Sequence, residues 1–380
     1  MSLHHVVGHE GFLSSIASAH ARSSLPASIL LRGPRGVGKQ RIALWIAQLT
    51  ICEASQDHRP CDACGSCRMA LNLEHPDIHW YFPLERPKRL TGDRLVTALE
   101  DARMQALTDL RAEPLYASHS SDVKGLYFGI TQTIRKRAHL RPHMSSGQVF
   151  IIGDAELLVP QAASPEAANA LLKLLEEPPG TSRFILTSSE PGRLLPTILS
   201  RTIPFHLAPI SPDLIARFLS EFTDVDNKTI EWACALSQGS IGRAMGFLPD
   251  GDQKGPLESL RRQALALIEA AVAQDPGRGY EISLSYPSAR ARTLIPLCTF
   301  IEEWLRDLSA IVSGAGDRVF NYDERSHLQG LVTRTSINAA EIARALTEVE
   351  EARELARGNV NPQLIVNSLV RNLRHRLTAT

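Results

Sequence analysis

The 380-residue sequence contains no run of about eighteen apolar residues, the length that a membrane-spanning helix needs. Its N-terminus has no basic start followed by an apolar stretch, so we expect no signal peptide, a cytoplasmic location and no membrane partner. An excess of either charge is also absent, because 41 Lys and Arg residues balance 41 Asp and Glu residues. The chain as a whole is therefore not a general binder of nucleic acid, although the balance allows a local basic patch.

Cysteine is scarce, and six residues in a chain of this length exclude a disulfide scaffold. Four of them nevertheless share one short segment, CEASQDHRPCDACGSC, with the spacing C-x8-C-x2-C-x2-C: Cys52, Cys61, Cys64 and Cys67. Two short C-x2-C steps let thiolates converge on one tetrahedral ion, and four sulfur ligands leave no position for water. The spacing therefore predicts a structural zinc site, with free thiols or a redox pair as the alternatives.

The length of the chain predicts two or three domains rather than one core. Short β-rich runs occur at residues 28–33, 148–152, 183–187 and 202–207, and helical patterns occur between them at 41–51 and 168–177. Such alternation over residues 1–207 predicts an α/β fold, in which helices cover both faces of a parallel sheet.

The sequence pattern of the second half of the chain predicts helices. Residues 208–250 form a compact helical segment, and the sequence from 248 to 256 is rich in helix breakers. Residues 257–380 predict an all-α domain, with helices at 257–275, 292–313, 323–333, 338–357 and 361–376. Residues 84–126 fit neither pattern, and we expect an insertion there with a helix near 93–110.

The stretch GPRGVGKQ, residues 33–40, follows an apolar strand and precedes a helix, which is the context of a phosphate-binding loop. In the G-x-x-x-x-G-K-[ST] loop, backbone N–H groups wrap the phosphates, the lysine reaches the outer ones and the last hydroxyl ligates Mg²⁺. Gly33, Gly36, Gly38 and Lys39 are in register, whereas Gln40 replaces the hydroxyl. The loop thus predicts either a degenerate nucleotide site that still takes ATP or ADP, or a glycine-rich turn that binds nothing.

The second half of an ATP site is an apolar strand that ends in Asp-Glu, where the Asp helps to hold Mg²⁺ and the Glu activates water. Here the strand QVFII ends in Gly153-Asp154-Ala155-Glu156. Gly153 cannot hold a metal, and Asp154 is shorter than the expected glutamate. Two metal positions, Gln40 and Gly153, are lost together, which predicts lost hydrolysis. The alternative is a shifted register in which Asp154 and Glu156 serve.

The segment AANALLKLLEEPPGTSRFILTSSEPGRLLPTILSRTIPFHLAP, residues 167–209, closely resembles the clamp-loader branch of the AAA+ ATPases. Segments at 5–13, 75–80, 239–248, 302–308 and 359–374 are also similar to that family, so the resemblance covers nearly the whole chain. It implies an AAA+ P-loop domain over 1–207 with an inserted zinc module at 52–67, a small helical lid over 208–250 and a helical collar domain over 257–380. The N-terminal segment would border the adenine pocket, with Val7 beside the nucleotide.

The resemblance also implies a division of labour within a hetero-oligomer. The family's Ser-Arg-Cys motif is similar to Ser200-Arg201-Thr202, and in the family that arginine reaches into the ATP of the adjacent subunit. The lid arginine of motor subunits is replaced by Gly242. These features favour a subunit without ATPase activity of its own, a rigid stator of a bacterial clamp loader that completes a neighbour's site. An ATP-hydrolysing motor subunit is the alternative.

The partners that the resemblance implies are the motor subunits, the clamp-opening subunit, the sliding clamp and primed DNA. A basic run at residues 134–141 could touch DNA phosphates in the assembled complex, or could be a solvated helix face; its cations are Arg135, Lys136, Arg137 and Arg141. A zinc-dependent DNA-binding protein is a third hypothesis, but no basic helix follows the cysteines at the spacing of a zinc finger.

Overall fold

A computed structural model of the chain describes residues 3–54, 59–87, 89–113, 124–158, 166–275, 277–335, 337–358 and 360–378. These residues form two compact units. The first holds those within Met1–Ser118, Lys124–Val225 and Ser237–Arg243, and the second those within Asp226–Leu236 and Ala244–Thr380. The division into three domains at residues 207 and 250 stays a prediction.

The first unit is built on a five-stranded sheet in the order β2-β5-β6-β1-β7, in which every neighbouring pair is parallel. This confirms the predicted α/β class. Three of the strands, β1, β5 and β6, are short, apolar and almost fully buried, as expected for strands that are covered on both faces, whereas the edge strand β7 is largely exposed. Their bounds are Ser28–Arg32 (β1), Ile78–Tyr81 (β2), Val149–Ile152 (β5), Arg183–Ser188 (β6) and Ile203–His206 (β7).

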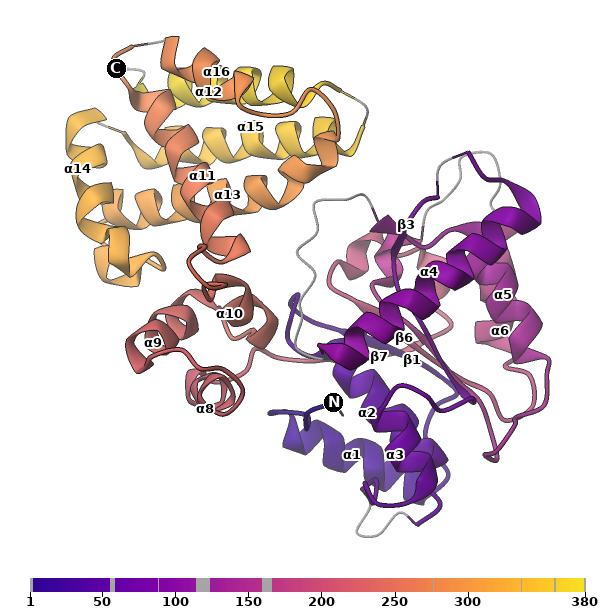
Figure 1. Ribbon diagram of the computed structural model, residues 1–380. Coiled ribbons are helices and arrows are strands. Elements are labelled where there is room, and N and C mark those ends of the chain that lie inside the picture. Colours follow the sequence, from indigo (N-terminus) through magenta and orange to yellow (C-terminus); the bar gives the residue numbers. More distant parts are fainter. Residues whose placement is uncertain are drawn as a thin grey trace. The chain divides into compact units, whose positions relative to one another are not determined.

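Alternate residues of these strands point to opposite faces of the sheet. Tyr81, Ile152, Leu186 and Leu30 form one row across four strands and belong to the core beneath α5 and α6. The other face is covered by α2, which follows β1 directly. Figure 1 shows α1, α2 and α3 on one side of the sheet and α5 and α6 on the other. The helices of this unit are α1 (Glu10–Ala21), α2 (Lys39–Ile51), α3 (Gly65–Leu71), α4 (Gly92–Ala112), α5 (Phe128–Ala138), α6 (Glu166–Glu176), α7 (Pro196–Leu199) and α8 (Pro212–Phe222).

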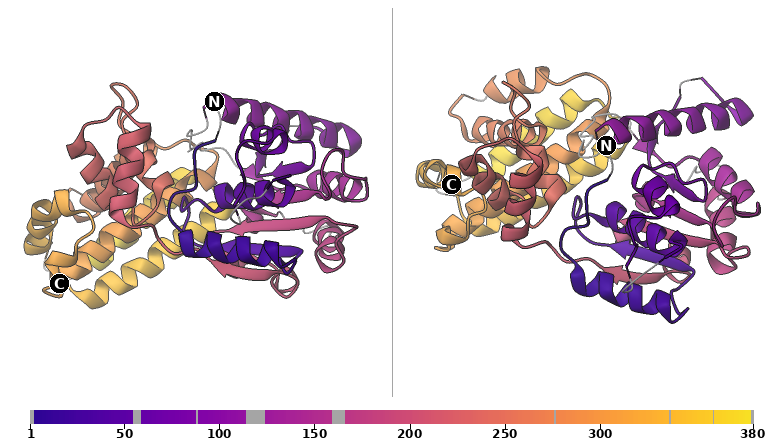
Figure 2. Two further views of the ribbon diagram at one scale, coloured as in Figure 1. Left: turned by 90° about the horizontal axis from the view of Figure 1, so that it is seen from below. Right: turned by 60° about the horizontal axis from the view of Figure 1, so that its bottom comes forward.

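The predicted insertion contains α4, a 21-residue helix that packs on α5 and is seen along the outside of its unit in both views of Figure 2. A two-stranded antiparallel pair, β3 (Leu84–Glu85) and β4 (Lys124–Gly125), joins the two ends of the inserted segment. Residues 114–123 lie outside the described residues. The insertion is thus closed by a short ladder and attached to the core by one amphipathic helix.

The described residues of the second unit form helices joined by turns and loops, with one isolated bridge between Asp250 and Gln253. The helix α13 is central because it packs against α11, α14 and α15. The helix α16 then packs on α15, α11 and α12. The bounds are α9 (Asn227–Leu236), α10 (Ile241–Phe247, which begins in the first unit), α11 (Pro256–Val272), α12 (Gly277–Leu284), α13 (Leu294–Val312), α14 (Arg325–Thr335), α15 (Ala339–Arg357) and α16 (Pro362–Thr378). Five 3-10 helices also occur in the described residues: η1 (Ala155–Leu157), η2 (Pro191–Arg193), η3 (Ala291–Thr293), η4 (Gly316–Arg318) and η5 (Tyr322–Glu324).

A buried arginine connects three parts of the second unit. The side chain of Arg261 on α11 is 0% exposed and forms ion pairs with Glu258 and Asp323. Its guanidinium lies 5.1 Å from the ring centre of Trp304 on α13 and 5.9 Å from that of Trp232 on α9. The Trp232 indole donates to Asp323 Oδ2 at 3.1 Å. A charge in this position is stable only because acids and aromatic faces surround it.

Across the described part of the chain, no helix combines the length and the apolar character that crossing a membrane requires.

Candidate functional site

The phosphate loop lies between β1 and α2, as the sequence predicts. Gly36 and Gly38 have φ of 76° and 95°, in the left-handed region that glycine adopts without strain. A Cβ at residue 36 would lie 2.5 Å from the hydroxyl of Ser240, which itself donates to the carbonyl of Arg35 at 2.8 Å. The glycine at this position is therefore required both by its φ and by the close approach of the 237–243 segment.

Lys39 is turned back onto its own loop. Its ammonium donates to the carbonyls of Gly33 at 3.0 Å and Pro34 at 2.7 Å, and to the hydroxyl of Ser189 at 2.8 Å. These three bonds use all three N–H donors of the group. Burial lowers the pKa of Lys39 to about 8. A phosphate could accept a hydrogen bond from this ammonium only if one of these three bonds were broken.

Gln40 occupies the place where the sequence leads us to expect a metal-ligating hydroxyl. Its carboxamide donates to Asp154 Oδ2 at 3.1 Å. A Cβ at residue 153 would lie only 2.9 Å from Cδ, Oε1 and Nε2 of the same side chain. The two departures from an ATP site, Gln40 and Gly153, are therefore in contact, and the amide fills the space of the missing side chain.

The two carboxylates after β5 are also engaged within the protein. The backbone N–H of Asp154 donates to the Thr187 hydroxyl at 3.0 Å, and Glu156 Oε1 accepts the N–H of Ser189 at 2.9 Å. Burial, and then the neighbouring Glu156, raise the pKa of Asp154. In the structure the Asp154 carboxylate accepts from the Gln40 amide and the Glu156 carboxylate from a backbone N–H, so the shifted register, in which both serve a metal, stays a prediction.

The 237–243 segment closes over the loop through backbone contacts. The N–H of Gly242 donates to the carbonyl of Gly36 at 3.0 Å, and a Cβ at residue 242 would lie 3.0 Å from Gly36 Cα. A larger residue at 242 would have to push the two backbones apart. The glycine at residue 242 therefore allows the tight closure of the loop.

The N-terminal segment runs beside the loop. Arg41 Nε donates to the carbonyl of His4 at 2.7 Å, and a ring nitrogen of His9 lies 3.4 Å from the carbonyl of Val37. These contacts bracket Val7, which is half-buried. The N-terminal segment that contains Val7 is thus held beside Val37 and Arg41, and the place of Val7 beside a nucleotide stays a prediction.

Arg201 lies on the surface of the first unit, in the turn between α7 and β7, and its side chain is 30% exposed. Its Nε donates to Glu176 Oε2 at 2.9 Å and its Nη1 to the carbonyl of Thr197 at 3.2 Å. Three of the five guanidinium N–H groups, one on Nη1 and both on Nη2, have no partner among the described residues. Exposed apolar side chains flank the turn at 41%, 37% and 51% exposure: Leu195, Leu199 and Ile203.

The four cysteines come together as the spacing predicts. Their sulfur atoms all lie within 4.8 Å of one another, and the Sγ atoms of Cys61 and Cys67 are 3.9 Å apart. Sulfurs on one tetrahedral zinc with Zn–S bonds of about 2.3 Å lie about 3.8 Å apart. The set joins Cys52 at the end of α2 to Cys67 in α3, with Cys61 and Cys64 between them.

Backbone N–H groups point at these sulfurs. Those of Cys61, Cys64 and Cys67 donate to the Sγ atoms of Cys52, Cys61 and Cys64, at 3.4, 3.3 and 3.4 Å. N–H bonds from Cys64 and Ala63 lower the pKa of Cys61 to about 6, whereas burial raises the pKa of Cys52 and of Cys67. Donors directed at sulfur stabilise thiolates, the form that binds metal, and the cluster can therefore hold a metal ion.

Only part of the basic run is available on the surface. Arg135, Lys136 and Arg141 are exposed, whereas Arg137 donates to Glu100 at 2.7 Å and to the hydroxyl of Tyr81 at 3.3 Å. Arg137 thus connects α5 to α4 and β2. Its role in the fold could not be read from the sequence, because Glu100 lies 37 residues away on the inserted helix.

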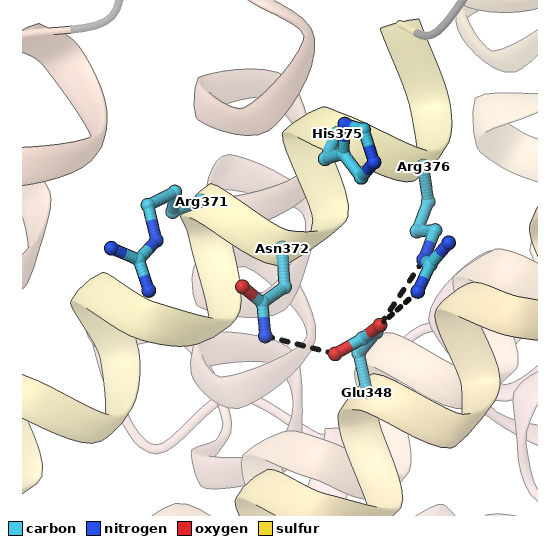
Figure 3. A pocket seen from close by; sticks show the side chains of 5 residues that line it. All are labelled: Glu348, Arg371, Asn372, His375 and Arg376. Carbon is cyan, nitrogen blue, oxygen red and sulfur yellow. Dashed lines mark hydrogen bonds and ion pairs between the residues drawn. The ribbon is translucent and has the colours of Figure 1, made fainter.

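A pocket of about 330 Å³ in the second unit contains none of the site residues that the sequence predicts. Figure 3 shows its lining on α15 and α16: Glu348, Arg371, Asn372, His375 and Arg376. Both Glu348 oxygens are used, one by Arg376 at 2.9 Å and the other by Asn372 at 2.8 Å. The acid therefore joins the two helices, and the lining carries a net positive charge.

The geometry defines a P-loop α/β domain in which Gln40 and Gly153 stand at the metal positions of the phosphate loop and a four-cysteine cluster follows α2. The family model described as "DNA polymerase III, delta subunit" matches residues 8–211, more than half of the chain. The chain therefore belongs to the DNA polymerase III delta subunit family.

Curated relatives carry the names of two kinds of subunit. The chain is 32% identical to DNA polymerase III subunit delta' of Pseudomonas aeruginosa over 216 residues, which cover 56% of this chain and 52% of that protein. It is 28% identical to subunit delta' of Escherichia coli over 63% of this chain and 59% of that protein. It is 26% identical to Escherichia coli subunit tau over 70% of this chain and 37% of that protein. The chain thus spans about two fifths to three fifths of the length of these relatives.

Among solved structures, a DNA polymerase III gamma subunit-related protein from Thermotoga maritima matches with a TM-score of 0.37 and 16% identity. The match covers 96% of this chain and 99% of that one. This likeness is too distant to bear on the role of the chain.

Proposed function

We propose that this chain is the delta-prime-type subunit of a bacterial DNA polymerase III clamp loader, a stator that hydrolyses no ATP itself. It completes the ATP site of a neighbouring gamma/tau motor subunit with Arg201. Its further partners in the holoenzyme are the clamp-opening delta subunit, the sliding clamp and primed DNA. The family match and the delta' relatives support this assignment.

The observation that carries the proposal is the contact of Gln40 with Asp154 and Gly153. An amide N–H donor lies where a magnesium ion would need an oxygen ligand, and residue 153 offers no side chain at all. Phosphoryl transfer depends on Mg²⁺ to neutralise charge between the outer phosphates. The chain therefore lacks the groups for hydrolysis, whether or not ATP or ADP binds to its loop.

Arg201 supports the second half of the proposal. A guanidinium is always charged, and its planar N–H groups match the oxygens of a phosphate. Three of its N–H donors have no partner in the part of the chain that the structure describes and can bind such oxygens. The exposed apolar side chains around Arg201 suit contact with another protein. An arginine supplied in trans can raise the rate of hydrolysis strongly without any chemistry on its own chain.

The cysteine cluster holds a structural zinc ion in this proposal. The sulfur spacing and the N–H donors fit four thiolates on one tetrahedral centre, which leaves no position for substrate. Bound zinc would join the end of α2 to α3 and to the loop between them.

A motor subunit of the gamma/tau type is the second candidate. It is favoured by the intact Gly33–Lys39 loop and by the relatives named tau, one of which matches 70% of the chain. The two candidates differ in one measurement, because a motor subunit hydrolyses ATP through its own loop.

The test is ATP turnover, measured first on the purified chain and then on a loader reconstituted with motor and delta subunits. We expect no turnover by the chain alone, with or without primed DNA. Arg201→Ala should slow the reconstituted loader and leave its assembly intact. Arg193→Ala is the matched control, since Arg193 also pairs with a surface glutamate, Glu190 at 3.1 Å. Robust turnover by the chain alone would favour the motor subunit, and a normal rate with Arg201→Ala would refute the trans role.

A further inference from the structure

Arg201 and Glu176 are both carried by fixed backbone. Glu176 is the last residue of α6, and the helix end is tied to β1 by the Ser28 hydroxyl, which donates to the carbonyl of Leu175 at 2.9 Å. Arg201 follows α7, where its N–H donates to the carbonyl of Ile198 at 3.2 Å. The next residue, Thr202, is buried and bonds the same carbonyl through its hydroxyl at 3.0 Å.

The ion pair leaves one end of the guanidinium open. The Glu176 carboxylate accepts the Nε–H of Arg201, and the carbonyl of Thr197 accepts one N–H of Nη1. Within the described residues the remaining donors, one N–H of Nη1 and both of Nη2, have no partner. Nη1 and Nη2 are the two nitrogens of the forked end that can bind two phosphate oxygens. Long arginine side chains otherwise sample many rotamers, and fixing one of them costs free energy when a partner docks.

We propose that Glu176 is a positioning residue for Arg201, which holds the guanidinium with its forked end directed outward before a partner subunit docks. This inference rests on the proposed trans role of Arg201 and names a second residue of the same site. The carboxylate meets the arginine on the side of Nε, away from the donors that a phosphate would use. Glu176 thus sets the direction of Arg201 and does not itself contact the nucleotide.

The neighbouring residue provides a matched control. Glu177 carries the same charge one position later, is exposed, and has no side-chain partner among the described residues. Glu177→Ala therefore removes an equal charge from the same surface without touching Arg201. The set of variants is Glu176→Ala, Glu176→Gln, Glu177→Ala, Arg201→Ala and the double variant Glu176→Ala/Arg201→Ala.

The first measurement is ATP turnover of the reconstituted loader. Glu176→Ala should lower kcat roughly three- to tenfold and leave KM for ATP unchanged, because orientation and not binding is lost. Glu176→Gln should fall between Glu176→Ala and the wild type, because its amide oxygen still accepts the Nε–H. In the Arg201→Ala background, Glu176→Ala should have no further effect. A merely structural residue would act additively there.

The second measurement needs no partner. In the full chain alone, the Nε–H proton of Arg201 should exchange with water several-fold faster in Glu176→Ala than in Glu177→Ala or the wild type, as read by NMR. Unchanged exchange would overturn the proposal.

The two proposals fail in different ways. Normal turnover with Arg201→Ala refutes the trans role and the positioning role with it. Slow turnover with Arg201→Ala but normal turnover with Glu176→Ala refutes the positioning role alone. An additive loss in the double variant would likewise show that Glu176 acts on something other than Arg201.

Discussion

The carboxamide of Gln40 lies so close to Gly153 that a single added carbon at residue 153 would meet three of its atoms at 2.9 Å. Gln40 and Gly153 are therefore matched in size. The glycine leaves room for the carboxamide, and the carboxamide fills the space that a side chain at residue 153 would occupy.

Gly153→Ala should destabilise the protein by about 1 kcal/mol, because it displaces the Gln40 amide and breaks its bond to Asp154. In a Gln40→Ala background, Gly153→Ala should leave the free energy of unfolding almost unchanged. Urea unfolding of the four proteins of this cycle measures the coupling. Gly192→Ala is the control, because a Cβ there would have no neighbour within 4 Å. Equal costs of Gly153→Ala in both backgrounds would contradict the coupling.

The cysteine cluster predicts about one zinc ion per chain. Cys64→Ser should reduce the zinc content to near zero and lower the Tm, because α2 and α3 lose their link. Cys234→Ala is the control: it removes a buried thiol outside the cluster and should keep the zinc. Elemental analysis beside calorimetry gives both readouts. A wild-type protein that folds normally without zinc would exclude a structural role for the metal.

Acid should destabilise the first unit through His79. Burial, and then the nearby arginines, lower the pKa of this histidine to about 4, whereas its ordinary value is 6.5. Between these values the unfolded chain takes up a proton that the folded chain refuses, so stability falls as the pH falls from about 6.5 to about 4. The slope near pH 5 is at most about 1.4 kcal/mol per pH unit.

His79→Phe should reduce the loss of stability at low pH. A phenyl ring should fit there, because the ring centres of His79 and Phe150 are 4.8 Å apart and His79 Nε2 has no partner among the described residues. Part of the slope should remain, because burial also lowers the pKa of His4 to about 4. Unfolding free energies at pH 7 and pH 5 measure the difference. An unchanged slope in His79→Phe would show that other groups cause the acid sensitivity.

Asp323→Ala should destabilise the second unit by about 3 to 5 kcal/mol, because it leaves the buried Arg261 with one acid fewer and frees the Trp232 indole. Arg344→Ala is the control, as the Arg344 side chain is 62% exposed and its pair with Glu341 should contribute less than about 1 kcal/mol. Thermal unfolding separates the two variants. A small loss in Asp323→Ala would mean that Glu258 alone suffices for Arg261.

Long periodic elements could be predicted from the sequence. The inserted helix, expected near 93–110, spans Gly92–Ala112, and the strand expected at 183–187 spans Arg183–Ser188. The helix α12 was not predicted, because the segment Gly277–Leu284 has two glycines in its first turn and a weak pattern. The strand β2 was not predicted either, since four residues at the edge of the sheet carry little periodic signal.

The candidate sites could be predicted where their residues are neighbours in sequence. Phosphate-loop glycines and the cysteine cluster have a fixed local spacing, which the sequence displays directly. The tertiary contacts that these residues make, however, join segments that are far apart in the sequence. Gly242 lies 206 positions after Gly36, and Glu176 lies 25 positions before Arg201. Sequence patterns carry no information about such pairs until the fold is known.

The backbone bond between Gly242 and Gly36 has a consequence for how such chains are recognised. The residues at positions 40, 153 and 242 fit one another by size: two glycines leave room for the Gln40 amide and for the backbone of Gly36. The glycines of the loop are required by its shape, whether or not the loop hydrolyses a nucleotide. A motif search that rewards only the glycines and the lysine would therefore not separate the stator proposed for this chain from an ATPase.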